Sequence, residues 1–176
     1  MPILVVHGSF ENFADLDPLT QKVQLSTSPI PVQELELTGY HIQFSDDTTF
    51  HPDHIIVELP FLAAQVHVAG PASSVTKKFD HTYGLPLACS GYAAGNPNSI
   101  TNFGVNLKFM VGKDIPRNFD INLKYYDPRT QANGGSDSII QMHRPAHVPA
   151  AAAGDALICK VNHILLYFNY KFVGNF

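Results

Sequence analysis

Hydrophobic and polar residues alternate position by position in two neighbouring segments of the chain. In Asn102–Val111, and again in Asn118–Tyr126, the apolar residues occupy the odd-numbered positions. Because successive side chains of a β-strand point to opposite faces, each segment is predicted to bury one face. Gly112 and Pro116 lie between them and favour a turn, so the pair is predicted to form a β-hairpin. Its predicted core-facing side chains are Phe103, Val105, Leu107, Phe109, Phe119, Ile121 and Leu123.

Other segments alternate over shorter stretches or less regularly. In Gln33–Phe44 the apolar positions change phase at Gly39, which predicts a strand that contains a bulge. Leu157–Val173 is apolar on both phases in part, which predicts a central strand or one covered by a neighbouring subunit. Pro60 is predicted to mark a bend because it cannot donate to a central ladder. The remaining predicted strands are Ile3–Val6, Lys22–Leu25, His54–Leu59, Ala64–Ala69 and Ser138–Met142.

Long connections rich in proline and glycine separate these strands, namely Gly70–Ile100, Asp127–Asp137 and His143–Asp155. Loops of this length in a compact domain are usually functional or held in place by a partner. No stretch shows the 3.6-residue periodicity of a helix. About eight strands with long loops therefore predict an all-β chain, a single antiparallel β-sandwich of jelly-roll type over residues 1–176. An immunoglobulin-like sandwich is the nearest alternative, but the chain contains no tryptophan.

Composition and charge exclude several classes of protein. The chain has 176 residues, of which 45% are hydrophobic, so it can build a core and general disorder is excluded. A formal charge of −4 gives no basic surface for the phosphates of a nucleic acid. No apolar run reaches the roughly 20 residues of a membrane-spanning helix, so we expect no membrane insertion. The start of the chain lacks the features of a secretory signal, and we expect synthesis in a reducing cytosol.

Two cysteines, Cys89 and Cys159, leave two interpretations open. They can form one disulfide, or they can be two free buried thiols, which is favoured because free cysteine behaves as a small hydrophobic residue. The segment Cys89-Ser90-Gly91 lacks the glycine pattern of a nucleophile elbow. Neither cysteine is therefore predicted to be a catalytic nucleophile.

One loop gathers residue types that ligate divalent metals, because it holds Asp46, Asp47, His51, Asp53 and His54. Their spacing matches no known ligand pattern, and Asp, Thr and Pro are common in turns. A solvated turn is therefore the favoured interpretation.

Other histidines give no stronger signal. Pro145 lies between His143 and His147 and opposes a helix that would bring them together. His67 is the single histidine of its predicted strand, whereas a cupin metal site needs two, separated by one residue. We therefore expect no metal, no cofactor, no catalytic residue and no enzymatic activity, although paired carboxylates of a glycosidase leave no local signature.

Aromatic residues are the remaining feature, with seven tyrosines and twelve phenylalanines. Exposed aromatic rings can stack on sugars in a lectin, or they can anchor a protein interface. For an interface, the predicted residues are Phe79, Tyr83, Leu85, Tyr92, Tyr170 and Phe172. For a lectin, the predicted binding face is Tyr83, Tyr92 and the loop Gly95–Asn102.

One block of the chain carries a family resemblance. The order begins with a strand, Lys22–Leu25, and a proline-containing bend, Ser28–Val32. A strand of alternating Glu and Leu follows in Glu34–Ile42, and then Val57–Pro60. This order resembles the opening of small jelly-roll structural proteins in the capsids of large DNA viruses. The resemblance implies a non-enzymatic capsid or cement subunit, made in the host cytoplasm and located in the virion. Met1–Leu19 contains no Lys or Arg, unlike the basic arms of capsid proteins that touch the genome.

These observations predict a virion structural protein that assembles through protein–protein contacts. Its expected partners are copies of itself, with a trimer favoured, and other capsid proteins, but not nucleic acid. The low share of charged residues, 15% against about a quarter in typical domains, leaves more surface for packing. Contacts are expected from the loops Gly70–Ile100 and Asp127–Asp137. Ordering these loops costs about 1–2 kcal/mol per residue in backbone entropy, and burial against a neighbouring subunit would offset this cost. The alternative is a carbohydrate-binding or adhesive β-sandwich with a bound glycan.

Overall fold

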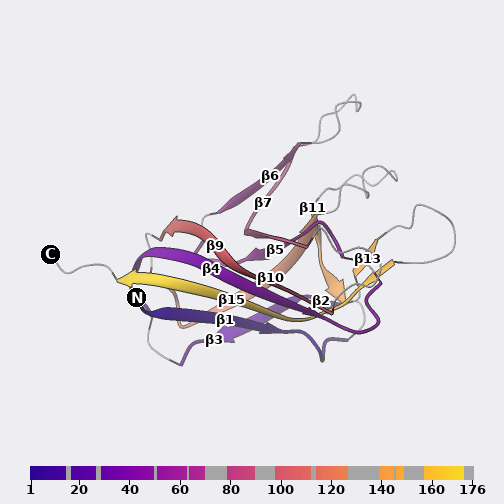
Figure 1. Cartoon of the computed structure of the whole chain (residues 1–176), viewed down its shortest axis with the longest axis horizontal. Coiled ribbons are helices and arrows are strands. Elements are labelled where there is room, and N and C mark those ends of the chain that lie inside the picture. The colour runs from indigo at the N-terminus through magenta and orange to yellow at the C-terminus, as the bar shows by residue number, and fades with distance from the viewer. Residues whose placement is uncertain are drawn as a thin grey trace.

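The computed structural model (Figure 1) shows an all-β chain with antiparallel sheets, as predicted for its general class. Within the part of the chain that it describes, no helix is long and apolar enough to cross a membrane. The described residues are 1–14, 17–26, 29–49, 51–62, 64–69, 79–89, 98–111, 114–126, 139–144, 146–148 and 157–172, with the backbone alone for 65–69, 79–82, 146–148 and 157.

The first sheet has four strands in the order β1-β15-β4-β9, and all three pairings are antiparallel. β15 lies between β1 and β4, so the central position predicted for the C-terminal strand is confirmed. The strand bounds are Ile3–Ser9 for β1, Val32–Phe44 for β4, Ser99–Met110 for β9 and Val161–Phe172 for β15.

The second sheet has the order β11-β10-β5-β8, and β3 pairs with β10 off this path. β3 pairs with residues 118–122 of β10 and β11 with residues 124–126. In Figure 1 the first sheet lies in front of the second, with β1, β15, β4 and β9 crossing the view. The bounds are Thr20–Gln24 for β3, His54–Glu58 for β5, Leu85–Ala88 for β8, Asn118–Tyr126 for β10 and Ile139–Gln141 for β11.

Three two-stranded ladders complete the described fold. β6 (Gln65–Ala69) pairs with β7 (Phe79–Tyr83), and this hairpin extends away from the sandwich in Figure 1. β2 (Asp17–Pro18) pairs with β12 (His143–Arg144). β13 (Ala146–Val148) pairs with β14 (Leu157–Cys159).

The core lies between the two sheets and is filled by aliphatic and aromatic side chains. The first sheet contributes Leu4 and Val6 from β1, Leu35, Leu37 and Ile42 from β4, and Ile164, Leu166 and Phe168 from β15. The second sheet contributes Ile55 and Val57 from β5, Leu85 and Leu87 from β8, and Phe119, Ile121 and Leu123 from β10.

The phase change predicted in β4 is confirmed. Relative to both neighbouring strands, the pairing of β4 shifts between Leu37 and Gly39. Thr38, the extra residue relative to β15, donates its hydroxyl to the Tyr167 carbonyl at 3.1 Å. A Cβ on Gly39 would lie 2.7 Å from the Phe103 ring, so the bulge brings that ring directly over the β4 backbone.

The predicted hairpin is wrong, because β9 and β10 lie in different sheets. The chain crosses between the sheets after Val111, and the crossing is fixed by Ile115, which is buried and pairs with Ile30. The Ile115 N–H donates to the Ile30 carbonyl at 2.8 Å, and the Ile30 N–H donates back at 3.0 Å. Alternation identified two strands but not their partners.

The predicted core face of β9 is wrong for two of its four residues, while Val105 and Phe109 pack against the core. Phe103 is 69% exposed and Leu107 is 43% exposed, while Val105 and Phe109 are half-buried. β9 is the edge strand of its sheet, and its residues between the pairs Gly39–Phe103 and Leu37–Leu107 bulge away from β4. The second half of the prediction is confirmed, since the β10 residues Phe119, Ile121 and Leu123 are buried.

The segment predicted as one long loop, Gly70–Ile100, contains two strands. β7 and β8 occupy residues 79–88, and β8 lies at the edge of the second sheet. Leu85 and Leu87 of β8 are buried, and Pro86 between them is exposed. An edge position suits Pro86 because proline has no N–H to donate to a ladder. Residues 70–78 and 90–97 of this segment, and 127–137 of the second predicted contact loop, lie outside the described residues.

Candidate functional site

A pocket of about 790 Å³ opens beside the end of β5. We name it the Phe61 pocket. Its apolar lining is Leu59, Pro60, Phe61, Leu62, Tyr83, Met110 and Phe119, and its polar lining is Glu58, Asp120 and Asn122. A concave apolar surface with a few convergent polar groups is the usual form of a small-ligand site.

The wall of the pocket is built by the turn that follows β5. Pro60 lies two residues after the end of β5, and the Leu62 N–H donates to the Leu59 carbonyl at 3.0 Å. The bend predicted at Pro60 is therefore confirmed. Phe61 packs edge-on against Phe119 of β10, with ring centroids 5.0 Å apart and planes at 85°. The turn is thus held against the second sheet by an aromatic contact.

The polar side of the pocket is a connected network. Glu58 accepts a hydrogen bond from the Asn122 amide at 2.6 Å and forms an ion pair with Lys124 at 2.6 Å. The Asn122 side-chain oxygen accepts from the Thr20 hydroxyl and from the Gln141 amide, each at 2.8 Å. These contacts hold the carboxylate and the amide in one orientation, as hydrogen-bonding partners for a polar ligand.

The predicted interface residues lie in different parts of the fold. Tyr83 is 54% exposed and lines the Phe61 pocket, whereas Leu85 is buried in the core. Phe172 is exposed near the end of β15, where its ring lies 5.2 Å from the ring of the half-buried Tyr170. For Phe79 only the backbone is described, and Tyr92 lies outside the described residues.

The acidic turn predicted as a weak metal candidate directs its side chains to separate partners. Asp47 forms an ion pair with Lys160, and the Asp46 carboxylate accepts from the Asn98 amide at 2.6 Å. His51 packs edge-on against Phe44 with ring centroids 4.2 Å apart, and burial lowers the pKa of its imidazole. The predicted turn is present at Asp46 and Asp47, whereas His51 is half-buried and His54 belongs to β5.

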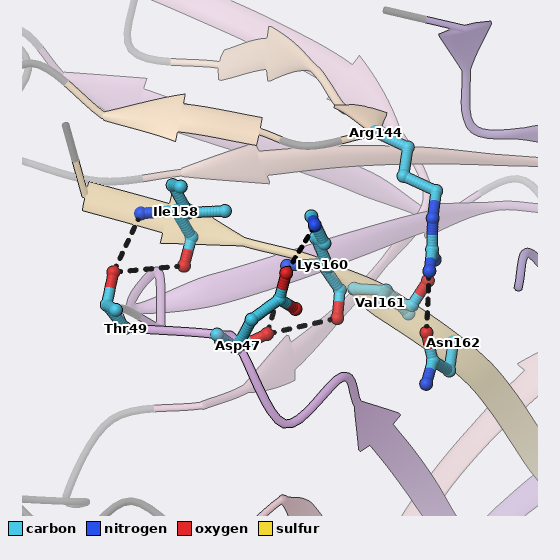
Figure 2. A network of polar contacts seen from close by, with 8 residues as sticks. Asp47, Thr49, Arg144, Ile158, Lys160, Val161 and Asn162 are labelled. Atoms are coloured by element: carbon cyan, nitrogen blue, oxygen red, sulfur yellow. Dashed lines mark hydrogen bonds and ion pairs between the residues drawn. The ribbon is translucent and has the colours of Figure 1, made fainter. Parts of the chain in front are cut away.

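This turn is fastened to the chain around Lys160, as Figure 2 shows. The Ser45 N–H donates to the Lys160 carbonyl at 2.9 Å, and the Thr49 N–H donates to the Ile158 carbonyl at 2.8 Å. In return, the Ile158 N–H donates to the Thr49 hydroxyl at 2.9 Å. Next along the chain, at the start of β15, the Val161 carbonyl accepts a hydrogen bond from Arg144 at 2.7 Å. These contacts give the turn a structural role.

The other candidate ligands are spread over several ladders. His143 lies in β12, His147 in β13 and His67 in β6, and for the last two only the backbone is described. Among the residues that the structure describes, no group of three or more His, Cys, Asp or Glu is arranged to hold a metal ion.

Both cysteines are free and buried, as the favoured interpretation predicted. Burial raises the pKa of the Cys89 thiol to about 12 and raises that of Cys159 well above its ordinary value. Because the thiolate is the reactive form of cysteine, neither residue is suited to nucleophilic chemistry.

Sequence reasoning missed an exposed apolar surface on the first sheet. We name it the outer face; it is the side of this sheet that points away from the core. Register places Val5, Tyr167, Gly39 and Phe103 in one row across all four strands. The rings of Phe103 and Tyr167 lie 5.5 Å apart over Gly39, and Val5 is 46% exposed. No local pattern reveals this row, because its members come from four separate segments.

The described residues thus present two candidate surfaces. The Phe61 pocket combines aromatic rings with oriented polar groups, which suits a small polar ligand. The outer face presents exposed apolar side chains in a row across the sheet, which suits a partner protein. Compared with protein-family models, with curated proteins and with solved structures, the chain gives no match.

Proposed function

We propose that this chain is a non-enzymatic structural subunit of a virion, built on a jelly roll, that assembles with copies of itself and with other capsid proteins. The observation that carries this proposal is the exposed apolar row on the outer face. The strand order and the polar groups around the row support it.

The order of the strands supports a jelly roll. Without the short β11, the two sheets contain eight strands, which in chain order are β1, β3, β4, β5, β8, β9, β10 and β15. Numbered in that order, the first sheet is 1-8-3-6 and the second is 2-7-4-5. First and eighth, second and seventh, third and sixth, and fourth and fifth strands are all neighbours. An eight-stranded antiparallel ribbon rolled into two Greek keys produces this pairing.

A jelly roll alone does not determine function, because capsid proteins and lectins share it. The outer face favours assembly. Beside its apolar row, the ion pairs Glu36–Lys108 at 3.9 Å and Glu34–Lys171 at 2.8 Å cross from strand to strand. An apolar centre with a polar rim is the usual composition of a protein interface. In the proposed assembly, Val5 and Phe103 become buried between subunits.

Light scattering coupled to size-exclusion chromatography tests this proposal. The full chain at tens of micromolar is expected to be a homo-oligomer, with the mass of a trimer favoured. Val5→Asp and Phe103→Asp are expected to give folded monomers, because both side chains are exposed in one subunit and would place a carboxylate in the interface.

The matched control is Gln24→Asp, which adds the same charge at an exposed position of β3 in the second sheet. It should leave the oligomer intact. Circular dichroism of each variant establishes that the fold is kept. A parent chain that is monomeric at this concentration would contradict the assembly proposal.

The alternative function, a carbohydrate-binding β-sandwich, is favoured by the Phe61 pocket. Its exposed Tyr83 ring can stack on a sugar, while Glu58 and Asn122 are held in position to accept and donate hydrogen bonds. If this is the function, a glycan screen yields a ligand whose affinity falls at least tenfold in Tyr83→Ala. Tyr170→Ala removes a half-buried ring that does not line the Phe61 pocket, and this variant should bind normally.

A further inference from the structure

Two histidines from opposite ends of the chain meet on the outer face. His7 of β1 and His163 of β15 are diagonal neighbours, since His7 pairs with Leu165 and His163 with Ser9. The His7 Nε2 and the His163 Nδ1 lie 3.2 Å apart, and the two ring planes are tilted by 38°. The pair lies one row away from Val5 and Tyr167 along the same strands.

The separation of these nitrogens fits a shared metal ion. Zinc binds imidazole nitrogens at 2.0–2.1 Å in tetrahedral geometry, which places two ligand nitrogens about 3.4 Å apart. The 3.2 Å between His7 and His163 is close to this value. Small rotations of the two rings direct both lone pairs at one ion, with no movement of the backbone.

Glu11 fixes the tautomer that such a site needs. The His163 Nε2 lies 2.9 Å from the Glu11 carboxylate, so its proton resides on Nε2 and the Nδ1 facing His7 carries a lone pair. A carboxylate behind a ligating histidine is a recurrent arrangement at zinc sites, where it orients the ring and raises its basicity.

His7 completes the arrangement. In a neutral His7 ring, the 3.2 Å contact places the one ring proton on Nε2, opposite the His163 Nδ1. Without metal, the His7 Nε2–H donates to the His163 Nδ1. On metal binding, the His7 proton moves to its Nδ1 by exchange with water, and Nε2 is left with a lone pair. No net proton is released.

We infer that His7 Nε2 and His163 Nδ1 form a two-histidine site for a divalent transition metal of the zinc, copper or nickel class, with Glu11 as its positioning residue. Imidazole is a preferred ligand of these ions. Glu11 contacts the far nitrogen of His163 and is therefore not a ligand of the same ion. The remaining coordination positions face solvent, where water or a donor from another molecule can occupy them. This inference stands independently of the proposed function.

Isothermal titration of the full chain with Zn²⁺ at pH 7.5 tests the site. The parent is expected to bind with one ion per chain at its strongest site. His7→Ala and His163→Ala should each weaken this affinity at least tenfold, because each removes one of two protein ligands. Glu11→Gln should weaken the Zn²⁺ affinity by about tenfold, because the carboxylate that orients the His163 ring is lost.

The matched control is His41→Ala. His41 lies on the same sheet, pairs with Leu165 from the other side of β15, and has its Nδ1 2.7 Å from the Thr101 hydroxyl. It should bind Zn²⁺ as the parent does. With Cu²⁺ as a second probe, the parent should show a visible absorption band that the His7 and His163 variants lose.

Three outcomes would overturn the site. They are a parent that binds no Zn²⁺ at millimolar concentration, a His7→Ala variant that binds as well as the parent, and a His41→Ala variant that loses as much affinity as His7→Ala. Thermal unfolding without metal establishes that each variant is folded. His7 is exposed on an edge strand, so its variant decides the question if His163→Ala does not fold.

Discussion

Leu123→Asp is expected to abolish folding, whereas Leu107→Asp is expected to leave a soluble, folded protein. Leu123 is 0% exposed and lies in β10, between β5 on one side and β3 and β11 on the other. Loss of a buried leucine alone costs about 2–5 kcal/mol. An unpaired carboxylate in the same place adds several more, which together approach the whole stability of a domain, about 5–15 kcal/mol.

Leu107 has the opposite environment although the two residues have the same place in the alternating pattern. It is 43% exposed on the edge strand β9, so an aspartate there remains hydrated. We expect a change in unfolding free energy of about 1 kcal/mol or less. Soluble yield, circular dichroism and urea unfolding of both variants measure the difference.

The control for Leu123 is methionine, which keeps apolar volume and should cost less than about 1.5 kcal/mol. A Leu107→Asp chain that fails to fold would mean that β9 is covered, as its alternation alone indicates. A folded Leu123→Asp chain would place the core on the other face of β10.

The alternating pattern identified strands well and their partners poorly. In β4 even the bulge before Gly39 was predictable. The apolar positions change phase there, and one extra residue in a strand is what keeps the apolar side chains on the buried face. For β9 and β10 the same kind of pattern led to a wrong hairpin. Alternation records which side chains share a face, but the pairing of β9 with β4 is set by contacts between residues about 70 positions apart in the sequence, such as Leu37 and Leu107.

The sequence did not predict the short strand β8 or the surfaces formed by residues from several strands, for different reasons. β8 is four residues long and contains Pro86, so its two buried leucines did not stand out from the surrounding loop residues. The outer face and the His7–His163 pair depend on register between distant strands, and the two histidines are 156 positions apart. Of the predicted interface residues, Tyr83 and Phe172 proved exposed and Leu85 proved buried, because residue type alone gives no information about burial.

Raising the pH from 8 to 11 is expected to destabilise the fold through its two buried thiols. Burial raises the pKa of Cys89 from an ordinary value of 9.0 to about 12, and it raises the pKa of Cys159 as well. Because the folded pKa lies above the unfolded one, the thiol's contribution to stability is complete below about pH 9 and is lost as the pH rises toward 12. In this window each thiol lowers the unfolding free energy by up to about 1.4 kcal/mol per pH unit.

Urea unfolding between pH 8 and pH 11 measures this loss, with a double variant, Cys89→Ala and Cys159→Ala, as the reference. Lysine and tyrosine side chains also titrate in this range, but they do so in both proteins. The variant is expected to be less stable at pH 8, since each substitution leaves a small cavity. Its stability should nevertheless fall less steeply above pH 9, because no buried thiol remains to ionise on unfolding. Parallel slopes in the two proteins would show that the thiols ionise as readily in the folded chain as in the unfolded one, and that Cys89 and Cys159 are not sealed in the core.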